Sequence, residues 1–156
     1  MYSVNTSPDE SSSAVEDRYL RIISMVRAQI EVPLAVKLSQ HITGLSSFAR
    51  RAEDAGANGL VLFNRFYGAE VDLDGLAMTS RLALSNPEEL RFPLRWIGIL
   101  RAQRPGLSLA ATTGVHSGLD AVKALLVGAD VACATSAVLQ HGTGWVGRML
   151  AELRTW

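Results

Sequence analysis

Short apolar segments alternate with longer amphipathic segments along most of the chain. The apolar segments are nearly continuous, which is typical of buried strands in parallel sheets, and they lie at 33–38, 59–63, 107–112 and 131–135. The amphipathic segments carry apolar residues at helical spacing, and they lie at 14–30, 45–55, 86–103, 119–127 and 144–153. This alternation predicts an α/β fold with a parallel sheet and right-handed crossovers, as a barrel or as a doubly wound sheet.

Local signals support these boundaries. Asn86-Pro87-Glu88-Glu89 is a strong helix start, because asparagine caps, proline fits the first helical position and acidic side chains oppose the helix dipole. A weak internal repeat relates 55–59 (AGANG) to 127–131 (VGADV), and each copy leads from a helix end into a strand. We expect strand 33–38 to be covered on both faces.

Two segments fit neither period. Residues 1–13 are rich in serine, aspartate and proline, so we expect a loop or disordered terminus ahead of an ordered domain at 14–156. Residues 64–85 are interpreted as a long loop with local β structure, in which short extended pieces contain Val71, Leu73, Leu76 and Met78.

Composition limits the function further. The chain has 156 residues, 15 basic and 15 acidic side chains and one cysteine, which indicates one globular domain without a disulfide framework. Balanced charge without a basic cluster argues against a nucleic-acid partner. No apolar run approaches the ~20 residues of a membrane helix, and the amino-terminal segment does not resemble a secretory signal. We therefore expect no membrane partner and a cytoplasmic protein.

Polar residues follow each predicted strand, where ligands bind in parallel α/β folds. They are Lys37, Asn64, Thr112 to Gly114, and Thr135 with Ser136. The hydroxyls and backbone N–H groups of the last two segments form the arrangement that a phosphate requires. The alternatives are a lysine that reaches solvent or a carboxylate and hydroxyls that only cap helices.

Other reactive side chains are weaker candidates. His41, His116 and His141 lack the spacing of metal ligands, so no metal site is predicted and these residues are interpreted as loop or surface histidines. Cys133 lies in an apolar strand and is expected to be an inert core thiol. No G-x-S-x-G motif supports a serine hydrolase.

Together, several of these segments resemble a known family. They are Val32 to Ser39, Ala55 to Arg65, Pro93 to Trp96, Ala110 to His116, Gly128 to Asp130 and Ala137 to Gly142. They resemble the C-terminal half of the dihydroorotate dehydrogenase family, particularly its bacterial dihydroorotate dehydrogenase-like branch. The resemblance extends from about Tyr2 to Leu153. It implies parallel βα units that form the C-terminal half of a TIM (β/α)8 barrel, together with FMN-dependent oxidation of dihydroorotate to orotate in pyrimidine biosynthesis.

The resemblance also implies roles for individual residues. Lys37 matches a lysine that contacts the flavin, and Asn64 matches an asparagine that binds the substrate. Two segments match those that hold the FMN phosphate: Thr113 with Gly114, and Thr135 with Ser136. Ser3 aligns with the catalytic base, and Asn5 with a substrate-binding residue. Thr113 and Thr135 replace common glycines, and their Cβ atoms crowd a close backbone approach.

The main hypothesis is therefore an FMN-dependent oxidoreductase of dihydroorotate dehydrogenase type, which we expect to be weak or inactive because the first half of the barrel is absent. Its partners would be a small-molecule substrate and either a second copy or a missing N-terminal half-barrel. One alternative is a non-catalytic half barrel that self-associates through its open sheet edges. Another is a phosphate-binding barrel enzyme of different specificity, acting on sugar phosphates.

Overall fold

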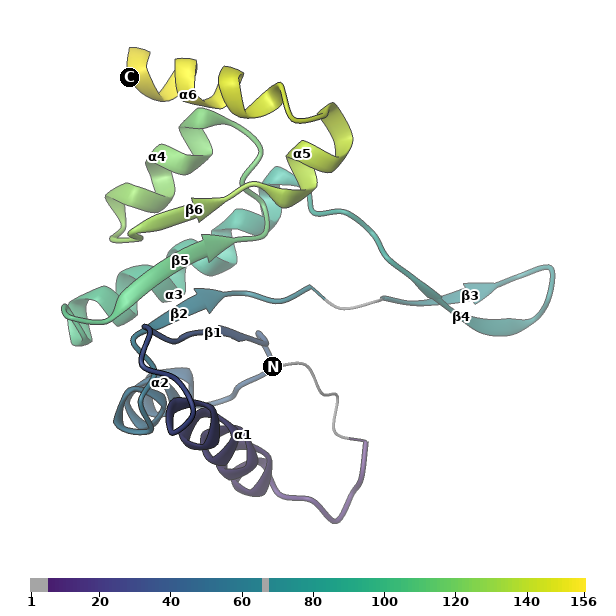
Figure 1. The fold of residues 1–156 in the computed structure, drawn as a ribbon. Coiled ribbons are helices and arrows are strands. Elements are labelled where there is room, and N and C mark those ends of the chain that lie inside the picture. Colours follow the sequence, from purple (N-terminus) through teal and green to yellow (C-terminus); the bar gives the residue numbers. More distant parts are fainter. Residues whose placement is uncertain (1–5, 66–67) are drawn as a thin grey trace.

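A computed structural model describes residues 6–65 and 68–156. Four of its strands form one parallel sheet in the order β1-β2-β5-β6 (Figure 1): Ala35–Leu38 (β1), Gly59–Leu62 (β2), Ser108–Thr112 (β5) and Val131–Cys133 (β6). The predicted parallel α/β fold is confirmed. These strands form an open sheet, with β1 and β6 at its edges, and not a closed barrel.

Helices precede, connect and follow the strands, and those that connect them cover one face of the sheet (Figure 1). They are Ser12–Arg27 (α1), Leu45–Asp54 (α2), Arg91–Gln103 (α3), Gly118–Leu126 (α4), Thr135–His141 (α5) and Trp145–Thr155 (α6). The core lies between this helical layer and the sheet, and it includes Phe48, Leu62, Ile97 and Leu100, all fully buried. Tyr19 of α1 extends the core by packing edge-on against Phe48, with ring centroids 6.5 Å apart.

The second face of the sheet is open in the described part of the chain. In β1, Val36 and Leu38 are buried, whereas Ala35 and Lys37 are exposed. The prediction that this strand is covered on both faces is therefore wrong. Its alternating side chains follow the period of two that places successive residues on opposite faces of a strand, and the described helices cover only one of those faces.

Helix starts follow the local signals in the sequence. α1 begins at Ser12, two residues before the predicted start, because Ser11 caps it by accepting a hydrogen bond from the Ala14 N–H at 3.2 Å. Asn86 caps a short 3-10 turn at Pro87–Leu90 (η1) that leads directly into α3. Its Oδ1 accepts from the Glu88 N–H at 3.0 Å, and Glu89 accepts from the Asn86 N–H at 2.7 Å.

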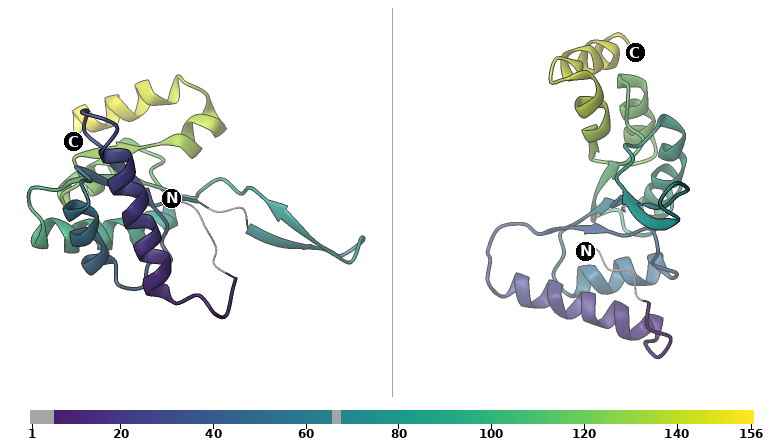
Figure 2. Two further views of the ribbon diagram at one scale, coloured as in Figure 1. Left: turned by 60° about the horizontal axis from the view of Figure 1, so that its bottom comes forward. Right: turned by 90° about the vertical axis from the view of Figure 1, so that its right-hand side faces the viewer.

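A hairpin projects from the body between β2 and η1 (Figures 1 and 2). It pairs Gly68–Asp72 (β3) with Ala77–Arg81 (β4) in antiparallel register, with Val71 opposite Met78. The predicted local β structure is thus an ordered hairpin. Each of its strand residues is exposed, so no face of the hairpin packs on the core.

Candidate functional site

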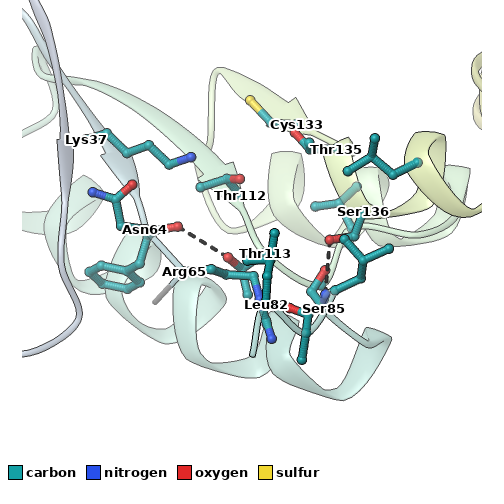
Figure 3. Close-up of a pocket in the computed structure, with 16 residues that line it drawn as sticks. Lys37, Asn64, Arg65, Leu82, Ser85, Thr112, Thr113, Cys133, Thr135 and Ser136 are labelled. Carbon is teal, nitrogen blue, oxygen red and sulfur yellow. Dashed lines mark hydrogen bonds between the residues drawn. The ribbon is translucent and has the colours of Figure 1, made fainter. Parts of the chain in front are cut away.

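A cavity of about 220 Å³ lies at the carboxyl ends of the parallel strands (Figure 3). All six residues that the sequence predicts for the flavin and substrate in the described ranges line it: Lys37, Asn64, Thr113, Gly114, Thr135 and Ser136. They come from four different strand ends, and the sheet order places those ends side by side. The fold therefore brings together residues that are as much as 99 positions apart in the sequence.

Lys37 and Asn64 form the β1 and β2 side of this cavity. Lys37 lies on the open face of β1 in the same row as Val61 of β2, because the strands pair in parallel register. Its side chain extends toward Thr112 (Figure 3). Asn64 follows β2, and its backbone N–H donates to the Leu38 carbonyl at 2.7 Å, which fixes where its side chain leaves the strand.

The turn after β5 is held in an uncommon backbone conformation. Thr113 has φ 76° and Gly114 has φ 83°, a region that favours glycine. The Thr113 hydroxyl donates to the Phe63 carbonyl at 3.2 Å, which ties the turn to the end of β2. A Cβ on Gly114 would lie 2.7 Å from the Leu90 Cα, so η1 packs too closely against this turn for a side chain.

Ser136 anchors the opposite wall. It is buried, and its hydroxyl oxygen accepts a hydrogen bond from the Ser85 N–H at 3.0 Å. The Ser85 hydroxyl in turn lies 3.1 Å from Nε2 of His116. These bonds fix the segment after the hairpin against α5 and the loop before α4. Thr135 is exposed at the start of α5.

Residues 82–85 are cavity-lining residues that the sequence-based reasoning missed. They belong to the segment interpreted as a loop, and they have no periodic pattern that would orient Ser85 inward. His116 lies in the loop between β5 and α4, as predicted, and its contact with the Ser85 hydroxyl was not predicted. Arg65 follows Asn64 directly, so its position beside the site was available from the sequence.

The cavity is chemically suited to an anion. Two cations line it, Lys37 and Arg65, and no carboxylate is among its described lining residues. Hydroxyls of threonine and serine supply further donors. Arg65 is ion-paired with Glu89 and donates from Nε to the Ala83 carbonyl at 3.0 Å. Lys37 is exposed and extends toward Thr112 in the cavity (Figure 3), so it is a candidate for contact with an anionic ligand.

Asp120 holds the loop that follows the Thr113-Gly114 turn. Burial raises the pKa of this carboxyl, but hydrogen bonds from Lys123, Ser117 and the His116 backbone outweigh burial and leave the pKa below its ordinary value. Its Oδ2 accepts from the N–H groups of His116 and Ser117 at 3.2 and 3.1 Å, and its Oδ1 accepts from Lys123 at 2.9 Å. The carboxylate thus fixes the start of α4.

Ser3 and Asn5 lie outside the described residues, so their assigned roles stay predictions. Cys133 is partly exposed and lines the strand-end cavity, so the prediction of a core thiol is wrong. It lies on the uncovered face of β6, opposite Thr112 in the register, where no described helix packs.

Across residues 6–65 and 68–156, no cluster of metal-ligating side chains is present, and no helix is long and apolar enough to cross a bilayer.

Several known proteins are similar to this chain in sequence, although no protein-family model matches it. A dihydroorotate dehydrogenase A (fumarate) of Limosilactobacillus reuteri (strain DSM 20016) is 32% identical over 113 residues, which are 68% of this chain and 35% of the relative. The catalytic subunit of a dihydroorotate dehydrogenase B (NAD(+)) of Cutibacterium acnes is 31% identical over 108 residues, which are 67% of this chain and 35% of the relative. A putative dihydroorotate dehydrogenase A (fumarate) of Aquifex aeolicus is 29% identical over 138 residues, which are 85% of this chain and 42% of the relative. The chain spans between 35% and 42% of the length of these relatives.

One solved structure has a similar fold. The crystal structure of DHODH in complex with ferulenol, from Eimeria tenella, matches with a TM-score of 0.71 at 18% identity. The match covers 88% of this chain and 43% of that chain. At this identity the similarity establishes the fold, and this chain folds like a part of that structure.

Proposed function

We propose that this chain belongs to the dihydroorotate dehydrogenase family and forms the C-terminal half of its flavin-binding (β/α)8 barrel. The single observation that carries the proposal is the convergence of Lys37, Asn64, the Thr113-Gly114 turn and Ser136 on one cavity. The same residues follow the predicted strands in the sequence, and the resemblance to the family assigns them flavin and substrate contacts. The similarity to curated relatives over about 110 to 140 residues supports the same assignment.

The residues present fit the phosphate end of FMN. The lining combines two cations with hydroxyl donors and contains no described carboxylate that would repel a dianion. Leu82, Leu84 and Leu139 supply apolar surface beside these donors, as a flat aromatic ring requires. Thr113 replaces a common glycine and adopts a positive φ that disfavours a β-branched residue, and its hydroxyl holds this conformation by donating to the Phe63 carbonyl at 3.2 Å.

The size of the cavity suggests an incomplete site. Its volume of about 220 Å³ is below the ~300–1,000 Å³ of typical ligand pockets. The sheet that carries it is open at β1 and β6. We therefore assign to this chain only part of the contacts that a whole flavin site needs, and we expect weak FMN affinity and little or no turnover from the isolated chain.

The chain's own residues would contribute binding and charge. When bound, FMN supplies a two-electron acceptor for the oxidation of dihydroorotate to orotate. The Lys37 ammonium would compensate negative charge on the flavin ring. The backbone N–H groups of the two phosphate segments would hold the phosphate. Asn64 and Asn5 would hydrogen-bond the substrate, and Ser3 would accept the proton that leaves it.

Binding of FMN tests this proposal directly. We expect FMN fluorescence to be quenched saturably by the chain, and riboflavin, which lacks the phosphate, to bind at least about tenfold more weakly. Lys37→Met should weaken FMN binding about tenfold. Arg91→Met is the matched control, because its side chain is 81% exposed and does not line the cavity, and it should change the affinity little. Equal affinity for riboflavin and FMN would contradict the assigned phosphate segments.

The remaining enzymatic alternative predicts a different ligand profile. A barrel enzyme for sugar phosphates uses the same hydroxyls and N–H groups for phosphate but has no need for the flavin ring. Thermal stabilisation of the chain by a pentose phosphate, with no stabilisation by FMN, would favour that alternative. Stabilisation by FMN that exceeds the effect of inorganic phosphate would favour the flavin assignment.

A further inference from the structure

Three polar side chains are joined by hydrogen bonds along one wall of the strand-end cavity. The Ser136 hydroxyl oxygen accepts from the Ser85 N–H at 3.0 Å (Figure 3), and the Ser85 hydroxyl oxygen lies 3.1 Å from Nε2 of His116. Ser85 is 3% exposed and Ser136 is 9% exposed. Both serines line the cavity, whereas His116 lies behind them and does not line it. We call these three residues the Ser85 bridge.

The His116 end of the bridge is fixed by its own backbone. The His116 N–H donates to Oδ2 of Asp120 at 3.2 Å, and the His116 carbonyl accepts from Nε1 of Trp145 at 2.8 Å. Asp120 belongs to α4 and Trp145 to α6. Two helices therefore hold the imidazole ring that contacts Ser85.

The bridge leaves the Ser136 hydroxyl proton for a partner in the cavity. A serine hydroxyl has one O–H donor and two lone pairs. The Ser85 N–H occupies one lone pair, and within residues 6–65 and 68–156 it is the one hydrogen-bond partner of the Ser136 side chain. An N–H that approaches the oxygen repels the hydroxyl proton, so the O–H turns away from Ser85. Because Ser136 lines the cavity, its O–H can donate to an acceptor bound there.

The cavity favours an anionic acceptor, since Lys37 and Arg65 line it and no carboxylate is among its described lining residues. A phosphate group offers charged oxygen acceptors, which make stronger hydrogen bonds than neutral ones do. We infer that Ser85 and His116 are positioning residues of the phosphate subsite, which hold the Ser136 hydroxyl as a donor to the phosphate. This inference rests on the proposed function, in which Ser136 contacts the FMN phosphate. The family resemblance assigns no role to Ser85 or His116.

Paired affinities for FMN and riboflavin test the inference. Ser85→Ala and His116→Leu should each weaken FMN binding about fivefold and leave riboflavin binding unchanged, because riboflavin lacks the phosphate. His116→Gln should keep the parent affinity, since its amide places a polar atom near the position of Nε2. Ser39→Ala is the matched control and should change neither affinity. Ser39 is also buried, and its hydroxyl also accepts a backbone N–H, from His41 at 3.1 Å, but it does not line the cavity.

A double variant separates positioning from a loss of packing. Ser136→Ala removes the donor itself and should weaken FMN binding about tenfold. Because Ser85 acts through Ser136, adding Ser85→Ala to Ser136→Ala should cause no further loss. Additive losses overturn the inference and leave the flavin assignment standing. The same holds for a Ser85→Ala variant that binds FMN and riboflavin with equally reduced affinity.

An amide NMR titration of the unmodified chain with inorganic phosphate covers variants that fail to fold. A phosphate that accepts the Ser136 O–H polarises the hydroxyl oxygen and strengthens its bond from the Ser85 N–H. The Ser85 amide proton should therefore shift downfield together with the amides of 135–137. A Ser85 amide that stays unshifted while 135–137 respond overturns the inference. Both shifts, in a chain that binds FMN no better than inorganic phosphate, support the inference and contradict the flavin assignment, whereas no response to either ligand overturns both.

Discussion

Asn58 and Asp130 make the same contact at two places in the sheet. Each precedes a strand and accepts a backbone N–H from the start of the neighbouring strand: Asn58 from Leu34 at 2.8 Å, and Asp130 from Leu109 at 2.8 Å. Each also faces an arginine, since Arg27 lies 3.5 Å from Asn58 and Arg101 lies 2.6 Å from Asp130. The sequence repeat at 55–59 and 127–131 is therefore a repeated structural device that fixes strand position.

This pair yields a stability prediction. Asn58→Ala and Asp130→Ala each leave a strand N–H without its side-chain partner, so each should lower the free energy of unfolding by about 1 kcal/mol. The two losses should add, because the sites share no partner. Urea unfolding followed by circular dichroism measures them, with Asp54→Ala on the exposed end of α2 as the control. Two variants that are as stable as the control would refute the shared role.

Asp120 should make the stability of the fold depend on pH, with a direction that its contacts determine. Its pKa is lower in the folded chain than its ordinary value, so its interactions stabilise the fold when it is ionised and are lost as pH falls through the folded pKa. The stability difference between the parent chain and Asp120→Asn should be largest near neutral pH. It should shrink below about pH 4. Urea unfolding across this pH range measures it, and a difference that grows toward low pH would contradict the assignment.

Gly114 should tolerate no side chain. Gly114→Ala adds strain from the positive φ and a clash with the backbone of Leu90, and we expect a loss of about 2–4 kcal/mol in unfolding free energy. Gly142→Ala isolates the first effect, because Gly142 has φ 81° and nothing lies within 4 Å of its added Cβ. That control should lose only about 1 kcal/mol. Equal losses would mean that the close approach of η1 contributes nothing.

The sequence predicted the sheet and its helices well, because buried strands and amphipathic helices follow strict periods. It also located Lys37, Asn64 and Ser136, since polar residues directly after an apolar run stand out against their surroundings. Their convergence followed from parallel topology, which aligns strand ends at one edge of the sheet.

Other features could not be predicted from the sequence, and each has a physical reason. The hairpin is exposed on both faces, so its side chains need no alternation of apolar and polar residues. Ser85 reaches Ser136 and His116 through a loop whose path depends on tertiary contacts that leave no local pattern. The open second face of β1 depends on what covers the sheet, and strand composition alone does not specify that.

The most direct test of the flavin assignment is an amide NMR titration of the chain with FMN. We predict saturable shifts concentrated at the backbone N–H groups of 113–115 and 135–137, with smaller changes at Lys37 and none at the hairpin. Riboflavin should leave the two phosphate segments unshifted. Shifts that are absent from these segments, or that riboflavin reproduces in full, would contradict the claim that this chain carries the phosphate end of a flavin site.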